Sequence, residues 1–102
     1  SYATRSAQAG KAQSKKSQYQ KQLADLNSII ESEKEGRKSL FDYDKKNDEY
    51  SPKHKMGAKA VAWSLELAKA KKLAPKITEL IAEQQAILDD KPTLDIPLPK
   101  GG

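Results

Sequence analysis

The spacing of apolar residues between positions 51 and 90 constrains the fold more than any other feature of the chain. From Met56 onward, apolar residues recur at alternating intervals of four and three. Because an α-helix completes a turn in about 3.6 residues, such residues share one helix face. Val61, Leu65 and Ala68 are expected to widen this face. The face comprises Met56, Ala60, Trp63, Leu67, Ala70 and Ala74, and beyond Pro75 it continues with Ile77, Leu80, Ile81, Gln84, Ile87 and Leu88.

Local signals suggest where these helices begin and end. Ser51-Pro52 is a good helix start, because a serine oxygen can cap free amides and proline suits the first helical position. Pro75 lacks an N–H and its ring crowds the preceding turn, so we expect a break or kink there. The pattern therefore predicts helical segments over residues 52–74 and 75–90, with Trp63 as the packing centre.

The N-terminal third carries a second apolar stripe. Ala9, Ala12 and Lys16 extend its register upstream. The stripe indicates a helix over residues 8–35 that ends near Gly36, since glycine readily adopts the conformation that stops helices. It is too short for an autonomous coiled coil, so we expect it to pack on the later helices or on another chain. Its strong positions are Tyr19, Leu23, Leu26 and Ile30.

The composition favours an all-α fold. Charged residues make up 32% of the chain, and the aliphatic β-branched residues recur at helical intervals, so we expect no strands. We predict two to three helices with extended N- and C-terminal tails. The expected division is a basic arm over 1–18, a helical domain over 19–91 and an extended, proline-rich tail over 92–102.

Three aspartates in the stretch 42–50 have the spacing of three ligands in a calcium-binding loop. However, Lys53 stands where the bidentate glutamate of such a loop belongs, and Asn47 replaces its turn glycine. We therefore expect no metal site. Instead we expect a solvated loop between helices, with Tyr43 and Tyr50 on the helices next to it.

The net charge of +5 is unevenly distributed. Residues 1–22 carry five bases and no acid, whereas residues 51–76 carry a net charge of +6 and the two remaining segments are each −3. This alternation fits pairing between oppositely charged helices. An acid-free basic arm can also bind a polyanion such as nucleic acid by releasing counterions. The candidate polyanion contacts are Arg5, Lys11, Lys15, Lys16 and Lys21.

The C-terminal stretch alternates apolar residues with prolines, which is typical of an extended strip with its apolar side chains on one side. Such a strip can dock into a groove on the same chain or on a partner. The candidate docking residues are Leu94, Ile96 and Leu98.

Motifs of catalysis are missing from the sequence. It has no glycine-rich phosphate loop, no nucleophile elbow and no zinc-binding helix motif, and it has one histidine and no cysteine. We therefore expect no enzyme, cofactor, metal or small-molecule substrate. No apolar run reaches the ~20 residues that span a bilayer, and no signal-peptide pattern opens the chain, so a soluble, non-secreted protein is expected. The first residue is Ser1, which fits either removal of an initiator Met or processing of a longer chain.

These features favour a non-enzymatic structural or assembly subunit of a larger complex, such as a virus or phage particle or a ribonucleoprotein machine. Its partners would be other protein subunits, reached through helix faces and tails. One alternative is a small basic nucleic-acid-binding protein that uses its N-terminal arm. Another is a small helical regulator or inhibitor that folds on an enzyme.

Overall fold

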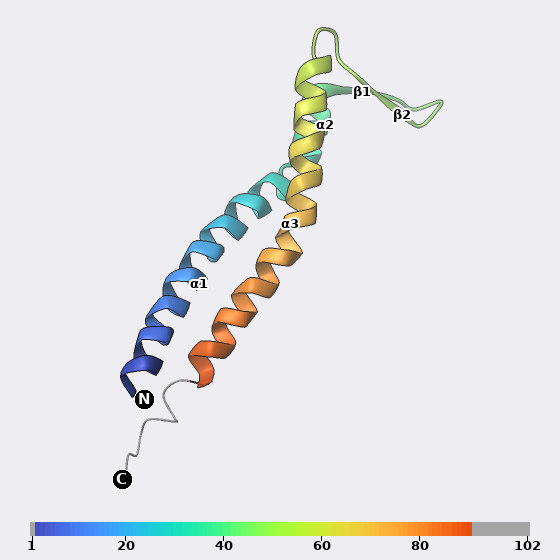
Figure 1. The fold of residues 1–102 in the computed structure, drawn as a ribbon. Coiled ribbons are helices and arrows are strands. Elements are labelled where there is room, and N and C mark those ends of the chain that lie inside the picture. Colours follow the sequence, from blue (N-terminus) through green and yellow to red (C-terminus); the bar gives the residue numbers. More distant parts are fainter. Residues whose placement is uncertain (1, 91–102) are drawn as a thin grey trace. The chain divides into compact units, whose positions relative to one another are not determined.

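The computed structural model describes residues 2–90, which divide into two compact units. One unit contains residues 2–24 and 75–90, and the other contains Asp25–Ala74. The described chain has three helices and one short β-hairpin, so the predicted all-α class with three helices is confirmed (Figure 1). The elements are α1 (Tyr2–Glu31), α2 (Glu33–Leu40), β1 (Phe41–Asp44), β2 (Glu49–Pro52) and α3 (Gly57–Asp90).

In the first unit, the N-terminal part of α1 lies antiparallel beside the C-terminal part of α3 (Figure 1). Ala9 and Ala12 are the buried residues of α1. Alanine has a small side chain, which allows two helix backbones to approach closely. Lys16 Nζ donates a hydrogen bond to Gln85 Oε1 at 2.5 Å and so links the two helices. The predicted extended N-terminal tail is thus helical from Tyr2, because it can pack along α3.

The second unit contains the end of α1, all of α2, the β-hairpin and the first half of α3. Its buried residues are Ala60, Leu67 and Ala70, which share one face of α3. In both units, buried and half-buried positions recur at the four-and-three spacing that the sequence shows. The residues predicted to pack between helices are all buried or half-buried: Tyr19, Leu23, Leu26, Ile30, Met56, Trp63, Leu67, Ile77, Leu80, Ile81 and Leu88.

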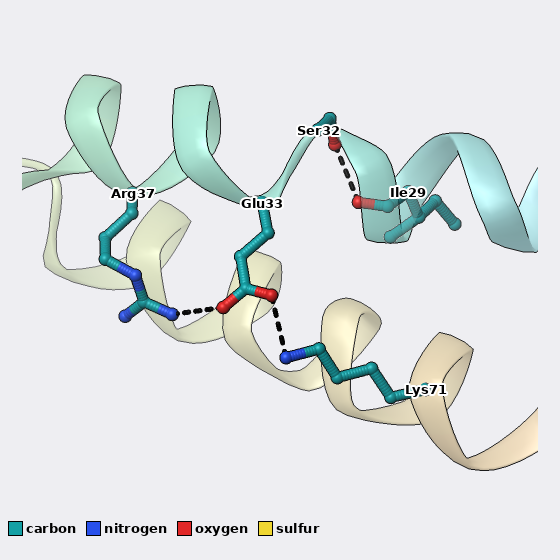
Figure 2. A network of polar contacts seen from close by, with 5 residues as sticks. All are labelled: Ile29, Ser32, Glu33, Arg37 and Lys71. Carbon is teal, nitrogen blue, oxygen red and sulfur yellow. Dashed lines mark hydrogen bonds and ion pairs between the residues drawn. The ribbon is translucent and has the colours of Figure 1, made fainter.

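The helix that was expected to end near Gly36 is interrupted at Ser32 and then resumes. The Ser32 hydroxyl donates to the Ile29 carbonyl at 2.8 Å, as Figure 2 shows. Such a bond from a serine side chain to its own helix competes with the regular backbone ladder. The helical path continues because the Gly36 amide donates to the Ser32 carbonyl at 2.9 Å. The predicted stop at Gly36 is therefore wrong, and α2 ends at Leu40.

Gly36 is needed for packing rather than for a turn. A Cβ atom added there would lie 2.5 and 2.7 Å from Cε2 and Cζ2 of Trp63, and nearer still to its Nε1. Distances this short are well inside van der Waals contact, so a side chain at this position would displace the indole. The glycine thereby allows α2 and α3 to approach each other through Trp63.

The β-hairpin corrects two expectations, namely that the chain has no strands and that Tyr43 and Tyr50 lie on helices. The two strands pair antiparallel, with Phe41 opposite Pro52 and Tyr43 opposite Tyr50. The Asp44 carboxylate organises the turn between them. It accepts hydrogen bonds from the Lys46 amide at 3.0 Å and from the Asn47 side chain at 2.7 Å. A short aspartate that bonds to the backbone ahead of it favours a turn over a helix.

Helix α3 also differs from the prediction at two points. It begins at Gly57, because Ser51-Pro52 belongs to β2 and the chain reverses at Lys55, whose φ is 62°. It is also one helix rather than two, because it runs through Pro75 without a break, whereas the expected kink stays a prediction. Proline removes one hydrogen bond from the ladder, and the bonds on either side maintain the helix. No helix in residues 2–90 has both the length and the apolar character needed to cross a membrane.

Two sequence predictions are not tested by the structure. Leu94, Ile96 and Leu98 lie outside the described residues. The proposed division into a basic arm, a helical domain and a tail stays a prediction.

Candidate protein-docking surface

An aromatic cluster forms where the hairpin meets the helices of the second unit. Residues opposite each other in a hairpin point to the same side, so Phe41, Tyr43 and Tyr50 share one face. The Tyr43 and Tyr50 ring centroids are 4.9 Å apart, and Phe41 and Trp63 are 5.9 Å apart. The Arg37 guanidinium lies 5.2 Å from the Tyr50 ring centroid and 5.6 Å from that of Trp63, within cation–π range.

Glu33 orients Arg37 and also connects α2 to α3 (Figure 2). One carboxylate oxygen accepts from Arg37 at 2.7 Å, and the other accepts from Lys71 at 2.7 Å. The hydrogen bonds from Lys71 and then from Arg37 hold the pKa of Glu33 below its usual value. Because the three side chains remain partly accessible to solvent, these pairs set geometry more than they add stability.

Two hollows in the second unit border the hairpin. The first lies between α2 and the aromatic face of the hairpin and has a volume of about 740 Å³. Its wall mixes aromatic rings with charges of both signs, including Lys34, Lys38 and Asp42. Among the described residues, no three side chains able to bind metal come together, and no buried polar side-chain atom lacks a hydrogen-bond partner. The hollow therefore offers a contact surface of mixed polar and aromatic character.

The second hollow lies between the base of the hairpin and α3, has a volume of about 220 Å³ and is almost entirely apolar. Beside it, the side chains of Val61 and Leu65 are 60% and 59% exposed. They lie on the side of α3 away from buried Ala60, Leu67 and Ala70. The hollow is lined by Phe41, Pro52, Ala60, Val61, Ser64 and Leu65.

The structure separates the predicted polyanion contacts into two groups. Lys11, Lys15 and Lys21 are exposed on α1. Arg5 is half-buried, and the Lys16 ammonium donates to Gln85. The acid-free segment is therefore only partly a solvent-facing cationic surface.

The exposed apolar side of α3 and the hairpin were not predicted, although the sequence contains signals for both. Val61, Leu65 and Ala68 were expected to widen the packed face, yet all three are exposed. Ile87, which was expected on the continuation of that face, is exposed as well. At about 100° per residue, Val61 and Leu65 fall far from the stripe centred on Trp63 and Leu67. The hairpin was signalled by alternating apolar and polar residues over Phe41–Asp44, which is the two-residue period of a strand.

Comparison with known proteins found no matching family, no matching curated protein and no matching solved structure.

Proposed function

We propose that this chain is a non-enzymatic helical subunit that assembles with another protein through the outer face of α3. This outer face is defined by Val61 and Leu65, together with the apolar hollow beside them. The observation that carries the proposal is the exposure of these two large side chains, 60% and 59%, next to an apolar hollow. Single exposed apolar residues are common, whereas an adjacent pair bordering a concave apolar surface is typical of a binding site.

The distribution of buried residues supports the same proposal. The most deeply buried residues are four alanines and Leu67, with exposures of 1–7%. Larger side chains are half-buried or exposed, so the fold leaves apolar area that a partner would cover. Burying the exposed parts of Val61 and Leu65 would contribute about 1–2 kcal/mol each to binding. The larger complex would be a particle such as a virus or phage, or a ribonucleoprotein machine.

The test compares what the tagged chain captures from its native source with what a Val61→Ser/Leu65→Ser variant captures. Protein mass spectrometry should identify a partner that is enriched by the parent and lost from this variant. Ile87→Ser is the matched control, because Ile87 is also an exposed apolar residue of α3, at 42%, but lies in the other unit. Circular dichroism must show unchanged helix content in each variant. A capture profile that is identical for the parent and the double variant would contradict the proposal.

Nucleic-acid binding is a second candidate function, supported by a specific surface of α1. Lys11 and Lys15 flank a shallow hollow that also includes Gly10 and Ser14 on the acid-free part of this helix. A labelled oligonucleotide should then bind with strong salt dependence. Replacing each lysine by glutamine should lower the slope of log affinity against log salt by about one. Binding that does not depend on salt, or a slope that is the same for the parent and the glutamine variants, would exclude this surface as a nucleic-acid-binding site.

A further inference from the structure

The exposed residues on the outer face of α3 lie in a line along the helix, and their spacing suits contact with a second helix. Ala58, Val61, Leu65, Ala68 and Lys72 are all exposed and recur at intervals of three and four. They therefore form one line along α3, which extends over about 21 Å at 1.5 Å per residue. The alanines leave space on either side of the two large side chains. This alternation of small and large side chains leaves gaps into which the side chains of a second helix can fit.

The charges at one end of this line all have the same sign. Lys69 and Lys72 follow the apolar residues, are exposed and form no ion pair with any residue among 2–90. Lys71, by contrast, is directed to the packed side, where it binds Glu33. The acid in this part of α3, Glu66, is offset from the line by about a quarter of a turn or more at 100° per residue. The exposed end of the face is therefore cationic.

We propose that the outer face of α3 binds an amphipathic helix of a partner protein, whose apolar stripe is followed on the same side by Asp or Glu residues. This inference rests on the proposed function and specifies the partner. The apolar side chains of the partner would contact Val61 and Leu65, and its carboxylates would lie opposite Lys69 and Lys72. The hollow of about 220 Å³ between Phe41, Pro52 and α3 would receive one large apolar side chain at the edge of the interface.

A helix fits this surface better than an extended peptide or a membrane. A strand binds by adding to an open sheet edge, whereas the backbone of α3 is already hydrogen-bonded within the helix. A membrane-binding helix presents a broad, convex apolar face to the lipid. Here only two large side chains are exposed on the line, and the surface beside them is concave. Both features favour a side-chain-by-side-chain fit with another helix.

The experiment is selection from a display library of random peptides of about 20 residues, with the parent chain as bait. Peptides that also bind Val61→Ser/Leu65→Ser are removed by counter-selection. The expected survivors have apolar residues at intervals of three and four and an excess of Asp and Glu at one end of the same stripe. Selected peptides should bind the serine variant at least tenfold more weakly in fluorescence anisotropy, which corresponds to ~1.4 kcal/mol.

A charge reversal tests the second half of the inference. With Lys69→Glu/Lys72→Glu as bait, the selected peptides should carry Lys or Arg where the first set carries acids. Survivors with no helical spacing, or with no change of charge on reversal, would overturn the inference. Binding of the chain to vesicles of phosphatidylserine and phosphatidylcholine, without any selected peptide, would overturn it in favour of a membrane surface.

The outcomes also separate this inference from the function on which it rests. If capture from the native source depends on Val61 and Leu65 but is indifferent to Lys69→Glu/Lys72→Glu, the docking function stands and the acidic-helix inference fails. If neither pair affects capture while the selected peptides behave as expected, the surface binds acidic helices but does not serve assembly.

Discussion

The packing of Gly36 against Trp63 gives the sharpest prediction for the fold. In the interior of a helix, replacing glycine by alanine stabilises by about 1 kcal/mol, because alanine loses less backbone freedom on folding. At Gly36 the added Cβ would lie 2.5 Å from Cε2 of Trp63. Forcing extra atoms into a packed site costs about 1–3 kcal/mol. Gly36→Ala should therefore leave the free energy of unfolding unchanged or lower it by up to about 2 kcal/mol.

Trp63 cannot move aside without breaking other contacts. Its ring lies 5.9 Å from that of Phe41 and 5.6 Å from the Arg37 guanidinium, measured between centres. A shift of the indole would disturb both contacts. The steric cost at Gly36 should therefore exceed what a freely rotating surface side chain would impose.

Gly10→Ala is the matched control, because Gly10 also lies within a helix and a Cβ added there meets nothing within 4 Å. It should stabilise the chain by about 0.5–1 kcal/mol. Urea unfolding followed by circular dichroism gives both values, and the fluorescence of Trp63, the single tryptophan, reports on the second unit directly. If Gly36→Ala stabilises as much as Gly10→Ala, the packing argument is wrong. In a Trp63→Leu background, Gly36→Ala should become favourable.

Three further predictions follow from local geometry. Lys71 and Arg37 lower the pKa of the Glu33 carboxyl group below its usual value of 4.5. The carboxylate therefore stabilises the fold above pH 4.5, and this stabilisation is lost as the pH falls through the lowered pKa. Glu33→Gln should be less stable than the parent at neutral pH, and the urea melts of the two proteins should converge in acid. The hydrogen bond from the Tyr43 hydroxyl to Asp48 raises the pKa of Tyr43 above 10.0. Asp48→Gly removes this bond, and glycine suits the backbone φ of 52° at position 48, so an ultraviolet titration should show the pKa of Tyr43 returning toward 10.0. Lys55→Gly should stabilise by up to about 1 kcal/mol because it relieves the positive φ, and equal stability of Lys55→Gly and Lys55→Ala would contradict this reasoning.

The sequence alone determined the all-α fold class. The four-and-three spacing from Tyr19 to Ile30 and from Met56 onward became the pattern of buried and half-buried positions. This succeeded because the periodicity of apolar residues is a property of the helix itself and does not depend on what the helix packs against.

The residues expected to begin or end helices were less reliable guides, because the same residue types also occur in strands, in helix interiors and at packed contacts. Ser51-Pro52 resembles a helix start, yet Pro52 pairs with Phe41 in the hairpin. Gly36 resembles a helix stop, yet it lies inside α2 beneath Trp63. Pro75 resembles a break, yet α3 continues through it. Pro52 and Gly36 are thus used for pairing or packing with another segment, and Pro75 lies within a continuous helix.

Helix periodicity puts Val61 and Leu65 off the stripe of Trp63 and Leu67, but only the tertiary structure decided that this side of α3 stays uncovered. Periodicity placed Val61 and Leu65 on a helix, but both faces of that helix carry apolar residues, and only the packing of the hairpin and α2 determines which face is covered. Ala60, Ala70 and Gly36 allow close approach of the backbones on the covered face, where Leu67 is also buried, whereas Val61 and Leu65 remain exposed on the other side.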